Sequence, residues 1–383
     1  MIEIAFWLFA VLVVYVYAGY PLILFLFSRL KPAQSFPRPS EAPSVTLLIS
    51  AFNEEDCIAD KIENSLALDY PGKSLKIVVI SDKSDDRTDE IVESYADRGV
   101  QLLRMEDRGG KTLGLNAGVA DSDSEIMVFS DANAMYRSDA IWALVTPFDD
   151  PNVGAVVGES TYSDAEEDSG ESESLYWRYE TAIKALESRS GSVVGGDGAI
   201  YAVRRALYQP MAADVLSDFV NPLQVVEQGY RCIYEPNAIS VEEVAGSYDK
   251  EFRRKVRIVN RAWRATMKMK RLLNPLVYGA FAWQFISHKL LRWLVPVFLF
   301  IALALNVLLL GTHSVYSVLF GLQIVFYNLA LAGAVLRDRM RLPFILYVPY
   351  YFCLVNIASW KGIVEAYGGK TYTTWSTPRS DGQ

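Results

Sequence analysis

Residues 4–27 run without a single charged side chain, in a chain of 383 residues that is half apolar. A helix of about 20 predominantly apolar residues spans the hydrocarbon core of a bilayer. The run is longer than the apolar core of a signal peptide and no small-residue cleavage site follows it, so we expect a retained anchor. Further charge-poor stretches lie at 293–311, 315–336 and 342–358. These features predict an integral membrane protein with a large polar middle.

Basic residues near the ends of the apolar stretches indicate how the chain is oriented. They follow the first stretch, precede the second and follow the third, where the sequence reads RDRMR at 337–341. Lys and Arg beside short membrane segments collect on the cytoplasmic side. All three groups agree if residues 31–290 are cytoplasmic and the N-terminus lies outside. We therefore predict a protein of the cell inner or plasma membrane whose catalytic domain is cytoplasmic.

The net charge indicates which partners are unlikely, and the cysteines indicate the redox compartment of the protein. The formal net charge is −8, which disfavours nucleic acid as a partner. Cys57, Cys232 and Cys353 are scattered without the spacing of metal sites. This usage fits a reducing compartment and a chain without a disulfide framework.

Between the apolar stretches, predicted strands and helices alternate. Buried-strand patterns lie at 44–52, 74–82, 100–105 and 125–131, with helical patterns between them. This alternation is typical of βαβ units and predicts an α/β fold with a mostly parallel sheet. In such sheets ligands bind in a crevice beyond the carboxyl ends of the strands. Three of the strand ends carry polar residues, in SAFNEE, ISDKSDD and FSDAN.

After residue 150 the pattern changes. We expect an acidic loop at 158–172, an amphipathic helix at 175–189, a glycine-interrupted strand at 191–205 and a basic helix with an apolar face at 251–273. The prolines and tyrosines of 342–366 leave open whether that segment spans the membrane or lies in its interface. We predict a transmembrane anchor at 1–30, a linker at 31–43, a catalytic domain at 44–248, amphipathic interfacial helices at 249–290, a transmembrane region at 291–366 and a tail at 367–383.

Two strand ends carry acids suited to a nucleotide. Asp131 and Asn133 have oxygen-bearing side chains one residue apart, just past a buried strand. Such a pair can hold a hard cation beside a diphosphate, although strand-end turns also favour Asp and Asn. Asp82 ends another strand, where it can accept a hydrogen bond from a nucleobase or a ribose. Capping of the next helix accounts for the acids that follow it.

Several other candidates each have a structural alternative. Lys111 follows two glycines at a predicted helix start, which suits a phosphate. Asp218 precedes an apolar helical pattern, where an acid serves either as an N-cap or as a base. Arg261 and Trp263 lie in the basic helix, whose cations and rings also suit a membrane surface. His288, at the membrane boundary, is either satisfied at the interface or a contact to an acceptor.

Taken in order, these stretches resemble the membrane-bound family 2 glycosyltransferases, the group that contains cellulose, hyaluronan and poly-N-acetylglucosamine synthases. SAFNEE and VVISDKSDDRTDEI are similar to the motifs of the first two strands, and GGKTLGLNAG to the Gly-Lys-x-x-x-x-Asn-x-Gly stretch. FSDANA stands where the family has Asp-x-Asp, and LSDFV resembles the motif of the catalytic base. The resemblance covers roughly residues 44–300. It has two departures: Asn133 replaces a carboxylate, and RIVNRAW lacks an intact Gln-x-x-Arg-Trp motif of processive synthases.

The resemblance implies a GT-A fold and an inverting glycosyltransferase that moves a sugar from a nucleotide-sugar donor, with UDP as the expected nucleotide, to a polysaccharide or lipid-linked acceptor. It places the catalytic base at Asp218 and Mg²⁺ or Mn²⁺ at Asp131 and Asn133. It assigns the donor to Ser50, Phe52, Glu54, Asp82, Lys111, Asp131 and Arg261. The acceptor candidates are Asp197, Trp263 and His288, because a carboxylate binds sugar hydroxyls and a ring stacks on a sugar.

Two rival interpretations stay open. One is an enzyme of the same fold that adds a single sugar to a lipid carrier, which the altered acceptor motif favours, whereas the overall layout favours a synthase. The other is a catalytically silent membrane protein that uses the fold for assembly, against which the presence of Asp82, Asp131 and Asp218 argues. Membrane lipid is an expected partner. A homo-oligomer is another, since so few membrane segments make a minimal polymer channel.

Overall fold

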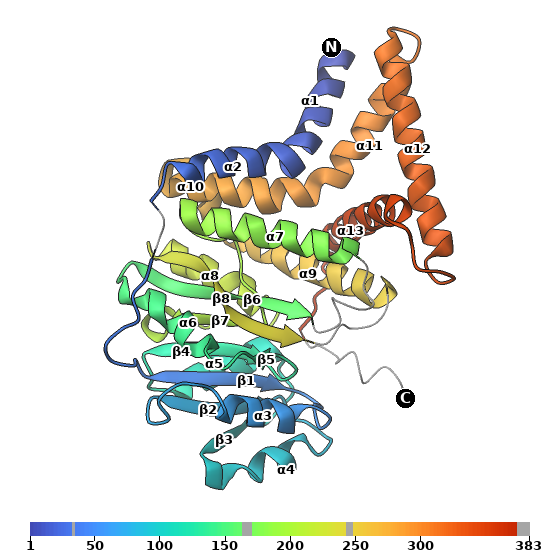
Figure 1. Cartoon of the computed structure of the whole chain (residues 1–383). Helices are drawn as coiled ribbons and strands as arrows, with labels where there is room; N and C mark the ends of the chain where they lie inside the picture. The colour runs from blue at the N-terminus through green and yellow to red at the C-terminus, as the bar shows by residue number, and fades with distance from the viewer. Residues whose placement is uncertain (33–34, 163–170, 243–247, 374–383) are drawn as a thin grey trace.

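The computed structural model describes residues 1–32, 35–162, 171–242 and 248–373 (Figure 1). An α/β domain occupies one end of the molecule, and long apolar helices extend from the other. The expected acidic loop at 158–172 lies largely outside the described residues, and its first five residues belong to a strand instead.

One eight-stranded sheet forms the centre of the domain, in the order β3-β2-β1-β4-β7-β6-β8-β5. The first four strands of the chain pair in parallel, as their alternation with helices predicts. Beyond β4 the sheet is mixed, because β7 pairs antiparallel with both β4 and β6. The strands are β1 (Val45–Ala51), β2 (Leu75–Ser81), β3 (Val100–Arg104), β4 (Ile126–Asp131), β5 (Met135–Tyr136), β6 (Val153–Tyr162), β7 (Tyr201–Arg204) and β8 (Arg231–Glu242).

Helices cover both faces of the sheet because successive side chains of a strand point to opposite faces. On β1, Leu47 packs into a core with α3, α4 and α6, whereas Leu48 packs into a second core with α5, α8 and α9. Every residue of β1 is buried, which explains its continuous apolar sequence. These helices are α3 (Ile58–Leu66), α4 (Thr88–Glu93), α5 (Lys111–Asp121), α6 (Ala140–Val145), α8 (Ser217–Glu227) and α9 (Tyr248–Lys268).

The predicted glycine-interrupted strand at 191–205 is only partly a strand. Residues 191–200 form a loop, and β7 begins at Tyr201. Gly195 takes a positive φ of 95°, which favours glycine, and the amide of Gly196 donates to the carbonyl of Asp218 at 2.7 Å. The loop therefore bonds to the start of α8 instead of extending the sheet ladder.

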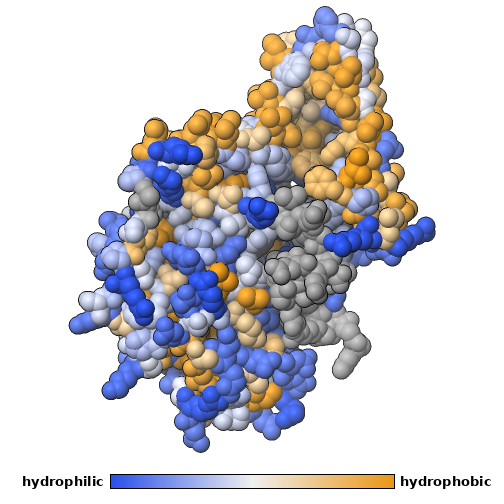
Figure 2. Space-filling model, viewed as in Figure 1, coloured by the Kyte–Doolittle hydropathy of each residue, from blue (hydrophilic) through white to orange (hydrophobic). Residues whose placement is uncertain are grey.

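Three helices are long and apolar enough to cross a membrane among the described residues: Ile2–Arg29, Pro275–Leu309 and Ser314–Leu336. In Figure 1, α1, α11 and α12 extend away from the sheet, while α2 and α10 turn to lie over α7. Figure 2 shows apolar surface concentrated over these helices and a polar surface over the sheet domain. The helices are α1 (Ile2–Val14), the π-helical η1 (Tyr15–Gly19), α2 (Tyr20–Arg29), α7 (Glu171–Ser190), α10 (Pro275–Phe285), the π-helical η6 (Ile286–Leu290), α11 (Leu291–Leu309) and α12 (Ser314–Leu336).

The segment whose placement the sequence leaves open, 342–366, forms α13 (Phe344–Tyr367). This helix is not one of the three candidate spans found in the described part of the chain. It lies against α9, where Tyr350 meets Tyr248 edge to face at 5.3 Å between ring centroids. α13 therefore joins the basic helix to the membrane-type helices.

Candidate functional site

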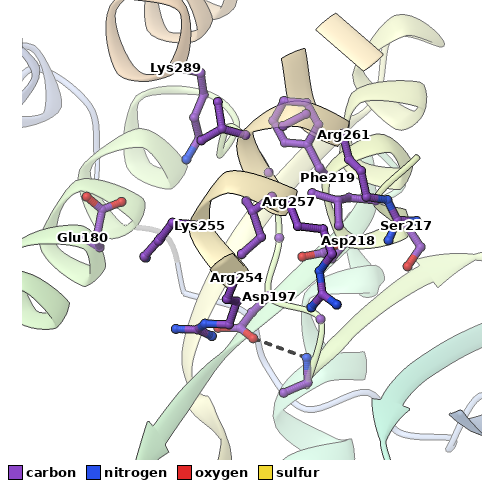
Figure 3. Close-up of a pocket in the computed structure, with 18 of the residues that line it drawn as sticks. Glu180, Asp197, Ser217, Asp218, Phe219, Arg254, Lys255, Arg257, Arg261 and Lys289 are labelled. Atoms are coloured by element: carbon purple, nitrogen blue, oxygen red, sulfur yellow. Dashed lines mark hydrogen bonds between the residues drawn. The ribbon is translucent and has the colours of Figure 1, made fainter. Parts of the chain in front are cut away.

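A cavity of about 700 Å³ opens beyond the carboxyl ends of β1 and β4. Ser50 and Asp131 line it from the sheet, at the edge where open α/β sheets bind ligands. From there it extends past α7 and α9, which contribute Glu180 and Lys255 (Figure 3). It ends at Tyr17 and Trp293, on two of the candidate spans, and at Asn356 on α13. One cavity thus joins the strand ends to the helices that are apolar enough to cross a membrane.

Lys111 interacts with two of the predicted acids, Asp131 and Asp218. It is the first residue of α5, and its ammonium donates to the Asp131 carboxylate and, at 3.0 Å, to the carbonyl of Gly198. A Cβ atom at Gly198 would lie 3.4 Å from Lys111 Nζ and 3.7 Å from Asp218 Oδ2, so glycine keeps this approach open. Burial acts to lower the pKa of Lys111, but the carboxylates of Asp131, Asp218 and Glu242 together outweigh it and hold that pKa above its usual value.

Asp218 lies in the first turn of α8 and lines the same cavity. Burial raises the pKa of its carboxyl group, the Lys111 ammonium opposes the rise, and the carboxylates of Asp197 and Asp131 add to it. A carboxylate with a raised pKa is a better proton acceptor at neutral pH than an ordinary one. The raised pKa is consistent with the predicted role of Asp218 as a base, which stays a prediction.

Asp82 directly follows β2, at the strand end where the sequence predicts it. It is 2% exposed and is not among the residues that line the cavity. Its Oδ1 accepts from the amide of Gly109 at 2.8 Å, and its Oδ2 from the amide of Gly110 at 2.9 Å. Gly110 has a φ of 84° and caps α5. Asp82 therefore anchors the glycine loop that precedes Lys111, and its contact with a nucleoside stays a prediction.

Of the three donor candidates in the first-strand motif, two line the cavity and the third packs in the core. Ser50 and Glu54 line the cavity, and Ser50 Oγ is buried without a hydrogen-bond partner among the described residues. Phe52 is 8% exposed, lies outside the cavity lining and packs beneath the guanidinium of Arg108, 3.6 Å from the ring centroid. Phe52 would need a rearrangement of Arg108 to reach a nucleotide.

Arg261 lines the cavity and also bonds to backbone carbonyls of the segment that precedes α8. Its Nη2 donates to the carbonyl of Val215 and, at 3.3 Å, to the carbonyl of Ala213, while its Nε is buried without a hydrogen-bond partner in the described part of the chain. Burial lowers the pKa of Arg261 to about 10. The guanidinium remains a cation at neutral pH.

The acceptor candidates differ in their access to the cavity. Asp197 lines it and forms an ion pair with Lys184 at 3.6 Å. His288 also lines it, with Nδ1 2.7 Å from a Glu187 oxygen. Trp263 is 6% exposed and packs edge to face against Trp293, with the ring centroids 6.3 Å apart. Trp263 is absent from the lining, so the sugar contact predicted for it has no open ring face.

Comparison with known proteins assigns the domain. Residues 46–209 match the sequence model described as Glycosyl transferase family 2. The chain contains a glycosyltransferase family 2 domain. The chain is 26% identical over 235 residues to the Probable glycosyltransferase YdaM of Bacillus subtilis, a match that covers 57% of this chain and 54% of that protein.

Two further relatives of the family 2 domain extend the comparison. The chain is 26% identical over 248 residues to the poly-beta-1,6-N-acetyl-D-glucosamine synthase of Staphylococcus aureus, covering 60% of this chain and 59% of that protein. It thus spans somewhat over half the length of the curated relatives it matches. The solved mannosyltransferase PcManGT from Pyrobaculum calidifontis, in complex with GDP-Man and Mn²⁺, superimposes with a TM-score of 0.73, 21% identity and coverage of 97% of this chain and 100% of that one. This likeness confirms the GT-A-like mixed α/β fold.

The oxygen donors of the family 2 domain fit a divalent cation only in part. Asp131 and Asn133 face the cavity with a carboxylate and an amide oxygen, which suit Mg²⁺ or Mn²⁺. Among the described residues, however, no group of three or more His, Cys, Asp and Glu side chains is arranged to hold a metal ion. A cation here would take its other ligands from the donor diphosphate and water, as Mg²⁺ commonly does.

Glu242 is a site residue that the sequence analysis missed. It ends β8 and lines the cavity, and burial together with the Asp197 and Asp131 carboxylates raises its pKa to about 8. The only sequence signal for it is an acid at a strand end, the signal that did single out Asp131. Trp177 of α7 was missed as well, although it gives this cavity an aromatic wall that Trp263 does not.

The raised pKa of Glu242 predicts a pH-dependent stability difference. An acid whose pKa is higher in the folded state lowers stability as the pH rises from its unfolded value, about 4.3, through its folded value. Glu242→Gln removes this effect, so we expect a higher melting temperature for the variant at pH 8.5 and a vanishing difference near pH 4.5. Thermal unfolding in detergent across this range, with Glu227→Gln on the surface as control, measures it. A gain that is equal at both pH values would contradict the assignment.

A buried carboxylate ties the family 2 domain to the membrane-type helices. Glu187 of α7 is fully buried, and its Oε1 accepts from the hydroxyl of Tyr20 at 2.5 Å and lies 2.7 Å from His288 Nδ1. Its Oε2 accepts from the amide of Val194 at 3.1 Å, directly before Gly195. This network explains the burial of His288, which the sequence alone could not distinguish from acceptor contact.

Proposed function

We propose that the protein is an inverting glycosyltransferase that moves a sugar from a nucleoside-diphosphate donor to a polysaccharide or lipid-linked acceptor at the cytoplasmic face of the membrane. The observation that carries the proposal is the meeting of Asp218, Lys111 and Asp131 at one cavity that reaches the membrane-type helices. A base, a cation and a carboxylate are the groups that a single displacement at an anomeric carbon requires.

In this mechanism the acceptor hydroxyl attacks the anomeric carbon of the donor sugar. The bond from the acceptor oxygen to that carbon forms while the bond to the leaving phosphate oxygen breaks, which inverts the configuration. Asp218 takes the proton of the hydroxyl. The electron pair of the broken bond leaves with the nucleoside diphosphate, whose growing charge Lys111 and Arg261 stabilise from the cavity wall.

A divalent cation held by Asp131 and Asn133 would neutralise the diphosphate when bound. Lys111 already pairs with Asp131, so this chain's own residues keep a cation beside that carboxylate. Ser50, whose hydroxyl has no hydrogen-bond partner among the residues that the structure describes, and Glu54 are the residues of the first-strand motif that we propose for the donor. UDP is the expected nucleotide, and the structural neighbour PcManGT, by its name, binds GDP-Man.

A non-processive enzyme that adds one sugar to a lipid carrier is a second candidate. The observation that favours it is the burial of Trp263, which removes an aromatic platform from the acceptor path. A gel of products made with radiolabelled sugar separates the two, since a synthase gives a ladder and the second candidate gives one band.

A panel of UDP- and GDP-sugars tests the function itself. The purified full chain in lipid nanodiscs is incubated with each donor, with Mn²⁺ or with EDTA, and release of nucleoside diphosphate is measured. We expect one donor to be consumed, and EDTA to suppress its consumption. No release from any donor, with Mn²⁺ and lipid present, would overturn the proposal.

The charge around Asp218 predicts the pH dependence of the reaction. Because the Asp197 carboxylate raises the pKa of Asp218, Asp197→Asn should move the acid limb of the kcat/KM profile to lower pH. Lys184 would lose its ion-pair partner in the variant, and its charge acts in the same direction. Asp197→Glu keeps the charge and serves as the control. An acid limb that stays in place, or moves to higher pH, would remove Asp218 as the group that titrates.

A further inference from the structure

A fully buried lysine lies in the core beneath the strand ends. Lys61 of α3 is 0% exposed and is not among the residues that line the cavity. Burial lowers its pKa to about 7, and the carboxylates of Asp131 and then Glu242 oppose the fall. Lysine is almost never fully buried unless it is paired. The partners of Lys61 therefore indicate what it does.

Those partners belong to the segment that directly follows β4. The ammonium of Lys61 donates to the carbonyl of Ala134. It also lies over the ring of Tyr136, 3.9 Å from the ring centroid, where the electron-rich face attracts a cation. In Figure 1, α3 lies beside β5, the strand that contains Tyr136. Lys61 thus bonds α3 to the chain just beyond the strand end.

This segment begins with the turn that carries the two candidate cation ligands. The amide of Ala134 donates to the carbonyl of Asp131 at 3.3 Å and closes the turn of residues 131–134. Asp131 and Asn133 line the cavity, whereas Ala134 is fully buried. The bond from Lys61 holds the last carbonyl of the turn from the core. It therefore fixes the side of the turn that lies opposite the two ligands.

Asn64 holds the same segment one helical turn further along α3. Residues three apart on a helix lie on one face, so Asn64 is a neighbour of Lys61. Its Nδ2 donates to the carbonyl of Tyr136 at 2.8 Å, and its Oδ1 accepts from the amide of Tyr136 at 2.8 Å. The hydroxyl of Tyr136 lies 3.0 Å from the carbonyls of both Phe129 and Ala199. The chain after the turn is thus fixed to α3, to β4 and to the loop that carries Asp197.

The surroundings of Lys61 are otherwise apolar. Ile58 and Ile62 of α3 share a core with Ala134 and Tyr136. A buried ammonium lowers stability unless its partners offset the lost hydration. What lysine adds over an apolar side chain is a donor for the Ala134 carbonyl, which would otherwise be buried without that bond.

We propose that Lys61 is a positioning residue, which holds the turn of residues 131–134 so that Asp131 and Asn133 face the donor diphosphate and its cation. The inference rests on the proposed function, from which it takes the role of these two side chains. Lys61 acts through the Ala134 carbonyl and touches neither the donor nor the cation. A positive charge near Asp131 would by itself repel a divalent cation. Charge and positioning therefore predict opposite effects of removing Lys61.

Lys61→Met in the full chain in lipid nanodiscs tests the proposal. Methionine is of similar length but has neither the charge nor the donor. Binding of UDP and of GDP is measured by calorimetry with Mn²⁺ and with EDTA. We expect nucleotide to bind about tenfold or more weakly with Mn²⁺, as when an outer partner of a metal site is lost, and equally well in EDTA. The electron paramagnetic resonance lines of the bound Mn²⁺ should also change shape.

Ser65→Ala is the matched control, and the melting temperature shows whether the variants fold. Ser65 is also buried in α3, but its hydroxyl donates to the carbonyl of Lys61 within the helix, at 2.7 Å. This variant should bind nucleotide as the unchanged chain does. The melting temperature of Lys61→Met should be unchanged or higher, because apolar replacement of a buried charge is often neutral or stabilising. A Lys61→Met chain that does not fold overturns the proposal, since Lys61 would then be a structural residue of the core.

The other outcomes are equally decisive. Nucleotide binding with Mn²⁺ that is unchanged or tighter in Lys61→Met overturns the proposal, and tighter binding would show that only the charge of Lys61 acts on the site. An equal loss with Mn²⁺ and with EDTA also overturns it, because the whole cavity is then disturbed.

Two results separate this inference from the proposed function. If Mn²⁺ does not strengthen nucleotide binding to the unchanged chain, this inference is overturned, while donor consumption still decides the proposed function. Conversely, a chain whose Mn²⁺ effect is lost in Lys61→Met but which consumes no donor sugar keeps this inference and loses the proposed function.

Discussion

Asp218→Asn should lower the turnover of the enzyme by about 10²–10⁴-fold, the usual contribution of a general base. An amide in this position fills the same space but cannot take the proton of the acceptor hydroxyl. The fold should survive, because the contact that fixes this turn is the backbone carbonyl of Asp218 with the amide of Gly196. Donor affinity should stay nearly unchanged. Steady-state kinetics and nucleotide titration measure the two effects separately.

Asp214→Asn is the matched control for that variant. Asp214 lies four residues away and is also partly buried, but it pairs with Arg264 and Lys268 and does not line the cavity. The control should keep turnover close to that of the unchanged protein. If both variants lose the same activity, the effect belongs to the structure of the 213–218 segment, and Asp218 is not the base.

Asp131→Ala should abolish the dependence of nucleotide binding on Mn²⁺. Asp131 supplies the cavity with the carboxylate beside Asn133 and is the ion-pair partner of Lys111. Loss of a mere outer-shell partner already costs metal sites about 10–100-fold in affinity, so a direct ligand should cost at least as much. Calorimetric titration of UDP or GDP, with and without Mn²⁺, reads the difference.

Two companion variants separate charge from shape. Asp131→Asn keeps the size of the side chain and should lose the Mn²⁺ dependence as Asp131→Ala does. Asp123→Asn removes an acid that is 82% exposed and remote from the cavity, and it should change nothing. Retention of the full Mn²⁺ effect in Asp131→Asn would show that the cation binds elsewhere.

The parts of the fold set by local pattern could be predicted from the sequence. The four parallel strands followed from apolar runs between helical patterns, and α5 begins at Lys111 as its two glycines indicated. The mixed half of the sheet could not be predicted, because the antiparallel pairing of β7 depends on a loop that bonds to the distant turn of Asp218.

The candidate site divides in the same way. Asp131 and Asp218 stand out because each follows or begins an element in a recognisable motif. Asp82 stands out for the same reason, yet its oxygens bond to Gly109 and Gly110, a tertiary pairing that no spacing reveals. Trp263 was chosen because an aromatic ring can stack on a sugar. Its ring packs instead into the core, against Trp293. The direction in which a side chain points, and whether it is buried, determined which of these residues line the cavity. The residue type alone did not.

The Glu187 network connects the cavity to two of the helices that are apolar enough to cross a membrane. A single carboxylate links Tyr20 of the first anchor and His288 of the second to the amide of Val194, and the chain from Val194 leads through Gly195 and Gly196 into Asp197. A helix whose apolar length does not match the surrounding bilayer tilts to compensate. A tilt of either helix would therefore displace the loop of residues 191–200, which carries Asp197, so the thickness of the surrounding lipid would change the shape of the cavity.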